Sequence, residues 1–149
     1  MFRKLICLVL LISMWSFAQQ PMVRGNGGSG WVQLGKLASA NFNSVADQTI
    51  TITIPGGASK YQVMGVLITN ASTSLTTAQG TIYSAASKGG TVLYGSSVTP
   101  YTTLTGATVT LQPAITIATS LTGNVFLSLT TAQGTAATAD VYVFGIPLQ

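Results

Sequence analysis

The residues that could do chemistry are few in this chain. There is no His and no Glu, and the acidic residues are Asp47 and Asp140 alone. The one Cys, Cys7, lies in an apolar N-terminal run. Acid–base catalysis, metal binding and nucleophile activation draw mainly on His, Asp, Glu and Cys side chains. The composition therefore predicts a non-enzymatic protein with no catalytic residues, no cofactor and no resident metal ion.

The reactive pairs that the sequence does contain are poorly arranged for catalysis. Ser59-Lys60 and Ser87-Lys88 have the residue types of a Ser/Lys dyad, but adjacent residues in extended chain point to opposite sides. Asp47 and Asp140 could share a Ca²⁺ ion, although such sites typically use more carboxylates. We expect each Asp just before a strand, where a charge limits pairing at a sheet edge.

The first 18 residues have the pattern of an export signal. Arg3 and Lys4 precede an unbroken apolar run from Leu5 to Ile12, and Ser16-Phe17-Ala18 supplies the small residues that a signal peptidase recognises. We expect cleavage before Gln19 and a secreted or periplasmic product. No stable membrane span is expected after cleavage, because a span needs about 20 apolar residues. If the leader is not functional, the expected location is the virion.

The remaining chain divides into a tether and a domain. Residues 19–30 are rich in glycine and predict a flexible tether, followed by one domain over residues 31–149. Four basic residues remain after residue 18, and they are scattered: Arg24, Lys36, Lys60 and Lys88. Nucleic-acid binding normally needs Lys and Arg clustered on one face, so nucleic acid is not an expected partner.

The domain has the composition of an all-β fold. Thr accounts for 22 of the 131 residues after residue 18, and Thr, Val, Ile and Tyr all favour strands. Residues 49–54 alternate Thr and Ile, which predicts a strand with one buried face. Turn residues separate the other expected strands, which are 61–69, 80–86, 91–95, 107–112, 123–130 and 140–147. This spacing predicts an antiparallel β-sandwich, a jelly roll being one such topology.

Two expected strand segments have apolar residues on both faces: Val63 to Ile68 and Val141 to Ile146. A two-layer sandwich normally leaves the outer face of each sheet in water. Apolar residues on both faces need a second cover, which a loop, the N-terminal segment or another subunit could supply. Because charged residues are only 5% of the chain, we expect a homo-oligomer.

One octapeptide, Ser-Leu-Thr-Thr-Ala-Gln-Gly-Thr, occurs twice, at residues 74–81 and 128–135. Each copy is expected between two strands, which predicts two equivalent strand–loop–strand units. Two copies are too few for a solenoid. The loops could form paired binding surfaces, but a polar turn used twice is the simpler interpretation.

Single residues also suggest two kinds of contact with sugars. Six aromatic side chains could stack on sugar rings, although aromatic residues in strands are more often in the core: Trp31, Tyr61, Tyr83, Tyr94, Tyr101 and Tyr142. Asn70-Ala71-Ser72 also matches the glycosylation sequon.

Several short motifs resemble small β-sandwich proteins encoded in bacteriophage and prophage genomes. They are Leu34–Leu37, Ala40–Ser44 with Asp47-Gln48, Thr69–Ala78, Ala85–Gly90 and Ala137–Tyr142. The resemblance spans about residues 34–147 and implies a virion-surface or head-decoration module without catalytic residues. The leader departs from this pattern, because capsid parts assemble in the cytoplasm, and would fit a domesticated or fused copy. We therefore expect a structural or assembly module on a virion or cell-surface scaffold, with a secreted glycan-binding module as the alternative.

Overall fold

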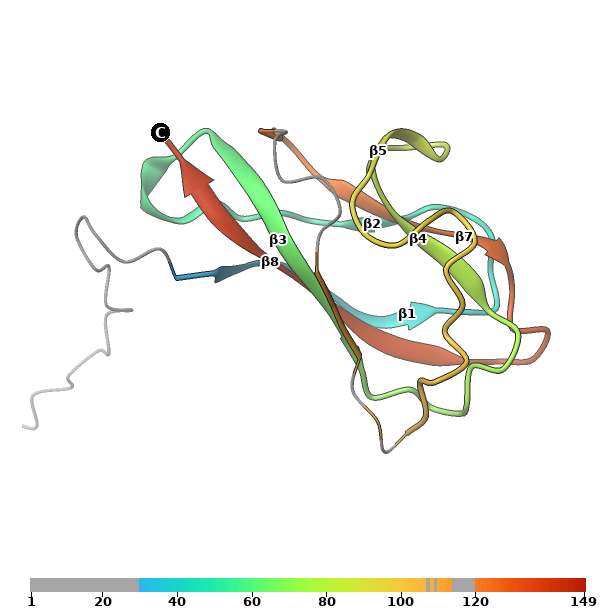
Figure 1. Cartoon of the computed structure of the whole chain (residues 1–149). Coiled ribbons are helices and arrows are strands. Elements are labelled where there is room, and N and C mark those ends of the chain that lie inside the picture. The colour runs from blue at the N-terminus through green and yellow to red at the C-terminus, as the bar shows by residue number, and fades with distance from the viewer. Residues whose placement is uncertain (1–29, 107, 109, 114–119) are drawn as a thin grey trace, which may run out of the picture.

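The computed structural model describes residues 30–106, 108, 110–113 and 120–149. Within these residues eight strands form two four-stranded antiparallel sheets, seen as two layers in Figure 1. The strands are β1 (Val32–Asn41), β2 (Gln48–Ile50), β3 (Lys60–Thr69), β4 (Gln79–Ala85), β5 (Gly89–Val92), β6 (Thr110–Pro113), β7 (Val125–Thr131) and β8 (Thr138–Leu148), with a short 3-10 turn, η1 (Pro55–Gly57). The expected all-β sandwich is confirmed. The expected signal peptide and nearly all of the expected tether lie outside the described residues.

The strands pair in a nested order along the chain. The first pairs with the last, β2 with β7, β3 with β6, and β4 with β5. Two further pairs, β3 with β8 and β4 with β7, complete sheets ordered β1-β8-β3-β6 and β2-β7-β4-β5. The chain therefore follows the path of one long hairpin folded over on itself, and only the connection from β4 to β5 stays within one sheet.

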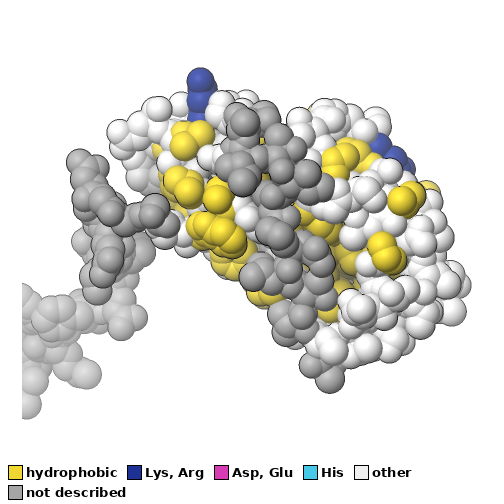
Figure 2. All heavy atoms as spheres, viewed as in Figure 1, with side chains coloured by type: hydrophobic (Ala, Val, Ile, Leu, Met, Phe, Trp, Pro, Cys, Tyr) yellow, Lys and Arg dark blue, Asp and Glu magenta, His cyan; other side chains and the backbone are white. Residues whose placement is uncertain are grey.

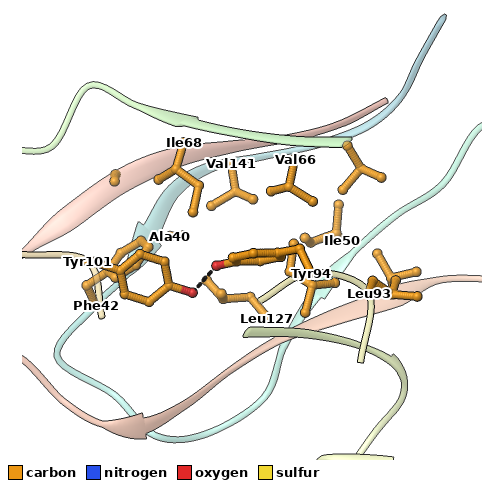
Figure 3. Packing of buried hydrophobic residues seen from close by; sticks show 14 of the residues in the cluster. Ala40, Phe42, Ile50, Val66, Ile68, Leu93, Tyr94, Tyr101, Leu127 and Val141 are labelled. Carbon is orange, nitrogen blue, oxygen red and sulfur yellow. Dashed lines mark hydrogen bonds between the residues drawn. The ribbon is translucent and has the colours of Figure 1, made fainter. Parts of the chain in front are cut away.

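The hydrophobic core lies between the two sheets. Val66 and Ile68 of β3 and Val141 of β8 are fully buried, and they face Ile50 and Leu127 of the other sheet (Figure 3). Successive side chains of a strand point to opposite faces, so each strand contributes alternate residues to this layer. Burying one large apolar side chain stabilises a fold by roughly 1.5–3 kcal/mol, which makes this layer the main source of stability.

For residues 49–54 the structure confirms that the Ile side chains face inward and the Thr side chains outward, but it does not confirm a strand of that length. The three Ile are buried or half-buried, and the three Thr are exposed. The strand β2 nevertheless ends at Ile50, because Ile52 already bridges to Gly35 of β1 in the opposite sheet. The segment crosses between the sheets here and closes one corner of the sandwich.

The other expected strands agree with the structure to within a few residues, and β1 is not among the strands expected from the sequence. The sixth strand lies at Thr110–Pro113 instead of 107–112. No bounds could be assigned to β1 from the sequence, because its register shifts between Gln33 and Gly35 and again between Leu37 and Ala40. Each shift breaks the alternation of apolar and polar residues on which strand assignment depends.

The outer face of the first sheet is partly apolar. The residues of β3 and β8 that point away from the core include Met64, Leu67, Phe144 and Ile146, all half-buried. Figure 2 shows hydrophobic side chains gathered over these two strands. No helix in the described part of the chain is long and apolar enough to cross a membrane.

The two copies of the octapeptide differ in structure. In the first copy residues 74–78 form a loop and 79–81 begin β4, whereas in the second copy 128–131 end β7 and the rest is loop. The expectation of two equivalent units is therefore wrong. The strand halves of the two copies pair with each other, with Gln79 opposite Thr131 and Thr81 opposite Ser128. Pairing within the sheet, and not the local sequence, decides which half is extended.

Candidate functional site

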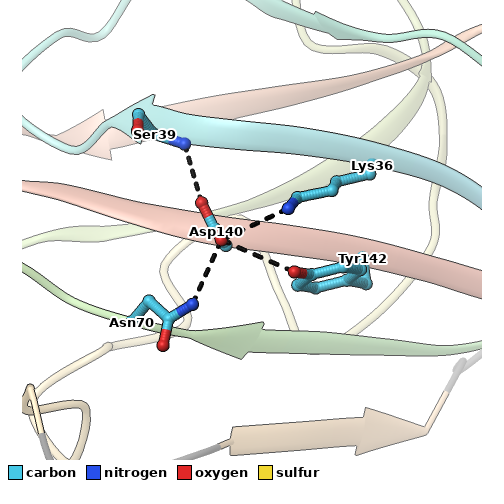
Figure 4. Close-up of polar contacts among 5 residues, drawn as sticks. All are labelled: Lys36, Ser39, Asn70, Asp140 and Tyr142. Carbon is cyan, nitrogen blue, oxygen red and sulfur yellow. Dashed lines mark hydrogen bonds and ion pairs between the residues drawn. The ribbon is translucent and has the colours of Figure 1, made fainter.

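Asp140 lies at the centre of a polar cluster on the outer face of the first sheet (Figure 4). It lies inside β8, which runs between β1 and β3, so the expectation that Asp140 precedes a strand is wrong. The strand begins earlier because Thr138 already pairs with Asn41 of β1. The neighbours Ala139 and Val141 are buried, and alternation therefore turns the Asp140 carboxylate away from the core.

Four groups contact the Asp140 carboxylate. The Ser39 backbone N–H donates to Oδ1 at 2.8 Å, and Asn70 Nδ2 donates to Oδ2 at 3.2 Å. Lys36 Nζ lies 3.5 Å from Oδ2, and the Tyr142 hydroxyl donates to the same oxygen at 3.5 Å. Lys36 Nζ also lies 4.9 Å from the centroid of the Tyr142 ring, which is a cation–π geometry. Two strands, β1 and β8, and one loop residue, Asn70, thus meet at one carboxylate.

The two residues that donate the shorter hydrogen bonds to Asp140, Ser39 and Asn70, both have a left-handed backbone. Ser39 has a φ of 51° and Asn70 a φ of 55°, a region that residues other than glycine occupy at a cost. Ser39 belongs to a β-bulge in which it and Ala38 lie opposite Asp140 alone. The carboxylate therefore stabilises an unfavourable backbone conformation on each side of β8.

These contacts keep Lys36 and Asp140 charged. The Ser39 N–H, then the Asn70 side chain and then Lys36 lower the pKa of Asp140. The pKa of Lys36 is raised, chiefly by the hydroxyl of Tyr142 and to a smaller extent by Asp140. A general acid or base works best with a pKa near the working pH. Both shifts here move the pKa further away from neutral pH. The cluster is suited to holding structure or contacting a polar partner.

Asp47 has a similar relationship to the turn between β4 and β5. Its carboxylate accepts hydrogen bonds from the Ser128 hydroxyl and the Ser87 backbone N–H. In that order the two bonds lower the pKa of Asp47, and Lys88 adds a smaller electrostatic effect. Asp47 directly precedes β2, as expected from the sequence. Ser87 and Lys88 have φ values of 59° and 56°, so this carboxylate also lies beside two left-handed residues.

Every non-glycine residue with positive φ in the described part of the chain lies beside one of the two carboxylates. Two of these residues lie beside Asp140 and two beside Asp47. Unfavourable backbone conformations persist only where the surroundings compensate for them. Here the compensation comes from the only two acidic side chains in the sequence.

The other candidate sites are not assembled. Ser87-Lys88 forms part of the left-handed turn, and Ser59-Lys60 leads into β3, with all four residues exposed. Asp47 and Asp140 have separate sets of partners, so the structure does not bring them together as ligands of one Ca²⁺. Among the described residues no group of three or more His, Cys, Asp or Glu could hold a metal ion.

Four of the six aromatic residues considered as sugar platforms are buried. They are Tyr61, Tyr83, Tyr94 and Tyr101, and for them that interpretation is wrong. Trp31, which is 47% exposed, and the half-buried Tyr142 remain at the surface. A glycan-binding interpretation therefore depends on these two residues.

Buried tyrosine hydroxyls have partners inside the sandwich. Tyr61 donates to the Gly123 carbonyl at 2.8 Å, and burial raises the pKa of Tyr61 to about 12. Tyr94 and Tyr101 share a hydrogen bond between their hydroxyl groups (Figure 3). Phe42 packs edge-on against Tyr101, with ring centroids 5.1 Å apart. These rings belong to the core, where a hydroxyl is tolerated because it is hydrogen-bonded.

No sequence pattern pointed to Gln133, which holds the two octapeptide copies together. Its Nε2 donates to the Ser74 carbonyl at 3.2 Å and to Thr76 Oγ1 at 3.0 Å. Its Oε1 accepts from the backbone N–H groups of Thr77 at 3.1 Å and Ala78 at 3.2 Å. All the hydrogen-bonding capacity of the amide is used. The repeat is the signal that could have led to this residue, because Gln133 belongs to one copy and its partners to the other.

Comparison with known proteins supplies no relative from which a function could be transferred. No protein-family model, curated protein or solved structure matches this chain. The function must therefore be inferred from the fold and from the roles of the individual side chains.

Proposed function

We propose that the domain is a non-enzymatic structural module that assembles on a virion or cell-surface scaffold. One observation carries the proposal: both carboxylates of the chain stabilise left-handed backbone segments and remain charged near neutral pH. The side chains best able to do acid–base chemistry thus have a structural role. In this proposal residues 1–18 direct export, residues 19–30 tether the domain, and the domain is oligomeric.

The nested strand order supports a jelly-roll topology. Jelly rolls have eight strands in two sheets and occur in viral capsid and lectin domains. A shared fold is only an analogy for function. It nevertheless agrees with the resemblance of about residues 34–147 to small β-sandwich proteins of bacteriophage genomes, and both point to a module on the surface of a particle.

A secreted glycan-binding module is a second candidate, and the Asp140 cluster favours it. Lectin sites combine an aromatic ring with side chains that hydrogen-bond to hydroxyl groups. Tyr142, Asp140 and Asn70 bring such groups together on one sheet face. Lys36 lies over the Tyr142 ring, so a sugar would have to displace it or stack on the other side.

Hydrolysis and glycan-binding assays on the purified full chain test this proposal against its alternatives. The wild type and the double variant Asp47→Asn/Asp140→Asn are incubated with ester, peptide and glycoside substrates, and folding is checked by circular dichroism. We expect no turnover by either protein and co-sedimentation of both with the particle or envelope fraction. Turnover that the double variant lacks would overturn the proposal. Saturable binding to a glycan array that Tyr142→Ala abolishes would instead establish the second candidate.

A further inference from the structure

We infer that the outer face of the β1-β8-β3-β6 sheet binds the same face of a second copy of this chain. The inference rests on the proposed assembly role and specifies the surface and the partner. It begins with the half-buried apolar residues of this face, Met64, Leu67, Phe144 and Ile146. Contiguous apolar surface on a soluble domain commonly marks an interaction site, and Figure 2 shows such side chains gathered over β3 and β8.

The size of this face matches that of a modest dimer interface. Strands β1 and β3 have 10 residues each and β8 has 11. At about 3.3 Å per residue and about 4.8 Å between strands, the three strands present a rectangle of roughly 33 by 14 Å. Two copies would then bury roughly 900–1,300 Å², depending on how much of β6 takes part. A specific interface needs about 1,000 Å² or more, so the whole face would be used.

The charges of this face are compatible with self-association. Lys36 and Asp140 are only 3.5 Å apart and neutralise each other within one copy. Strand alternation places Lys60 on the same face at the opposite end of the sheet. A two-fold axis lying across the strands would place each Lys60 over the partner's Asp140 end, whereas an axis along the strands would bring the two lysines together. The first arrangement avoids like-charge contact.

A second copy fits this face better than a charged partner does. The face offers apolar surface, one internally neutralised ion pair and Lys60 at one end, which gives an oppositely charged surface little to bind. Two apolar faces of the same shape, in contrast, both gain by excluding water. An isologous contact, in which each copy uses the same patch, is also the commonest arrangement of homodimers.

Light scattering and sedimentation equilibrium of the full chain test the inference, with samples from about 1 µM to about 100 µM. Leu67→Lys places a charge among the apolar residues, and Gln33→Glu places one beside Phe144 without removing an apolar group. Val98→Lys is the matched control, because Val98 is an isolated valine, 56% exposed, outside this sheet. We expect a wild-type dimer, a dissociation constant raised about tenfold or more in both face variants, and no change in the control.

A monomeric wild type at the highest concentration would overturn the inference, as would a dimer that survives both face variants. If Leu67→Lys fails to fold, the Gln33→Glu variant decides the test, because Gln33 is exposed and its substitution leaves the core intact. Binding of liposomes or a glycan array by a monomer would assign the face to those partners instead. The proposed function is judged separately: a monomer that co-sediments with particles refutes only this dimer, and a dimer that hydrolyses substrate refutes only the structural role.

Discussion

Asp140 and Ser39 are 101 residues apart in the chain, yet the Ser39 backbone N–H donates a 2.8 Å hydrogen bond to Asp140 Oδ1. Ser39 is left-handed and lies in the bulge of an edge strand, while Asp140 belongs to the central strand beside it. A bulge leaves one residue without its normal ladder partner. The carboxylate supplies that partner, and in doing so fixes the register between the first and last strands.

We expect Asp140→Ala to lower the free energy of unfolding by about 1–2 kcal/mol, since Ser39 and Asn70 would lose an acceptor and keep an unfavourable backbone. Urea denaturation measures this change. In a Ser39→Gly background the same substitution should cost less, because glycine adopts positive φ easily. Equal losses in both backgrounds would show that the carboxylate does not compensate for the left-handed serine.

The stability of the domain should fall at acid pH through its two carboxylates. Their pKa values are lowered in the folded state, so their contribution is present above the ordinary Asp pKa of about 3.9 and is lost as pH falls through the folded values. Melting temperatures followed by circular dichroism should be flat from about pH 8 to about pH 5 and fall below about pH 4. The Asp47→Asn/Asp140→Asn variant should melt lower at neutral pH and lose most of the acid dependence. An unchanged acid response in this variant would contradict the assignment.

Gln133→Ala should destabilise the domain by about 1–3 kcal/mol, because the Thr77 and Ala78 N–H groups would lose their acceptor in a largely buried place. The equivalent residue of the other octapeptide copy provides the control. Gln79 contributes a backbone carbonyl to Thr130, which alanine retains, so Gln79→Ala should change stability by less than about 0.5 kcal/mol. Similar effects of the two substitutions in chemical denaturation would refute the difference between the copies.

The two glycines of the repeat should tolerate substitution by asparagine to very different degrees. At Gly80 a Cβ atom would lie 2.5 Å from the Ser128 carbonyl oxygen, so Gly80→Asn should cost about 3 kcal/mol or prevent folding. At Gly134 the φ is 85° and the space around the Cβ position is open. Asparagine tolerates such a φ, and Gly134→Asn should cost less than about 1 kcal/mol. Thermal melts of the two variants compare them directly.

Export can be tested by mass spectrometry of the chain recovered from a secreting host. The Ser16-Phe17-Ala18 sequence predicts a mature protein that begins at Gln19. Replacing Ala18 with Arg should block cleavage, because the peptidase requires a small residue there, and the control Gln20→Ala should be processed normally. A wild-type protein that retains Met1 in the cytoplasm would contradict export and favour assembly within a virion.

The sequence was sufficient to predict the fold class, since strand alternation and the Thr and Ile content depend only on local preference. It was insufficient wherever long-range pairing decided the outcome. The bulge at Ser39 obscured β1, and Asp140 was placed before its strand because its pairing with a distant residue could not be read locally. The octapeptide is the clearest case, because the same eight residues form loop then strand at Gln79 and strand then loop at Gln133.

The pairing of β1 with β8 also has a consequence for the timing of folding. The sheet that contains both strands cannot be completed until β8 has emerged, because β8 lies between β1 and β3. Contacts this distant in sequence close slowly, since the loop entropy must be overcome before they contribute. A sandwich of this topology therefore closes late, after β8 has been made. Under the export proposed above, that delay would keep the chain threadable through a translocation pore until its release from the membrane.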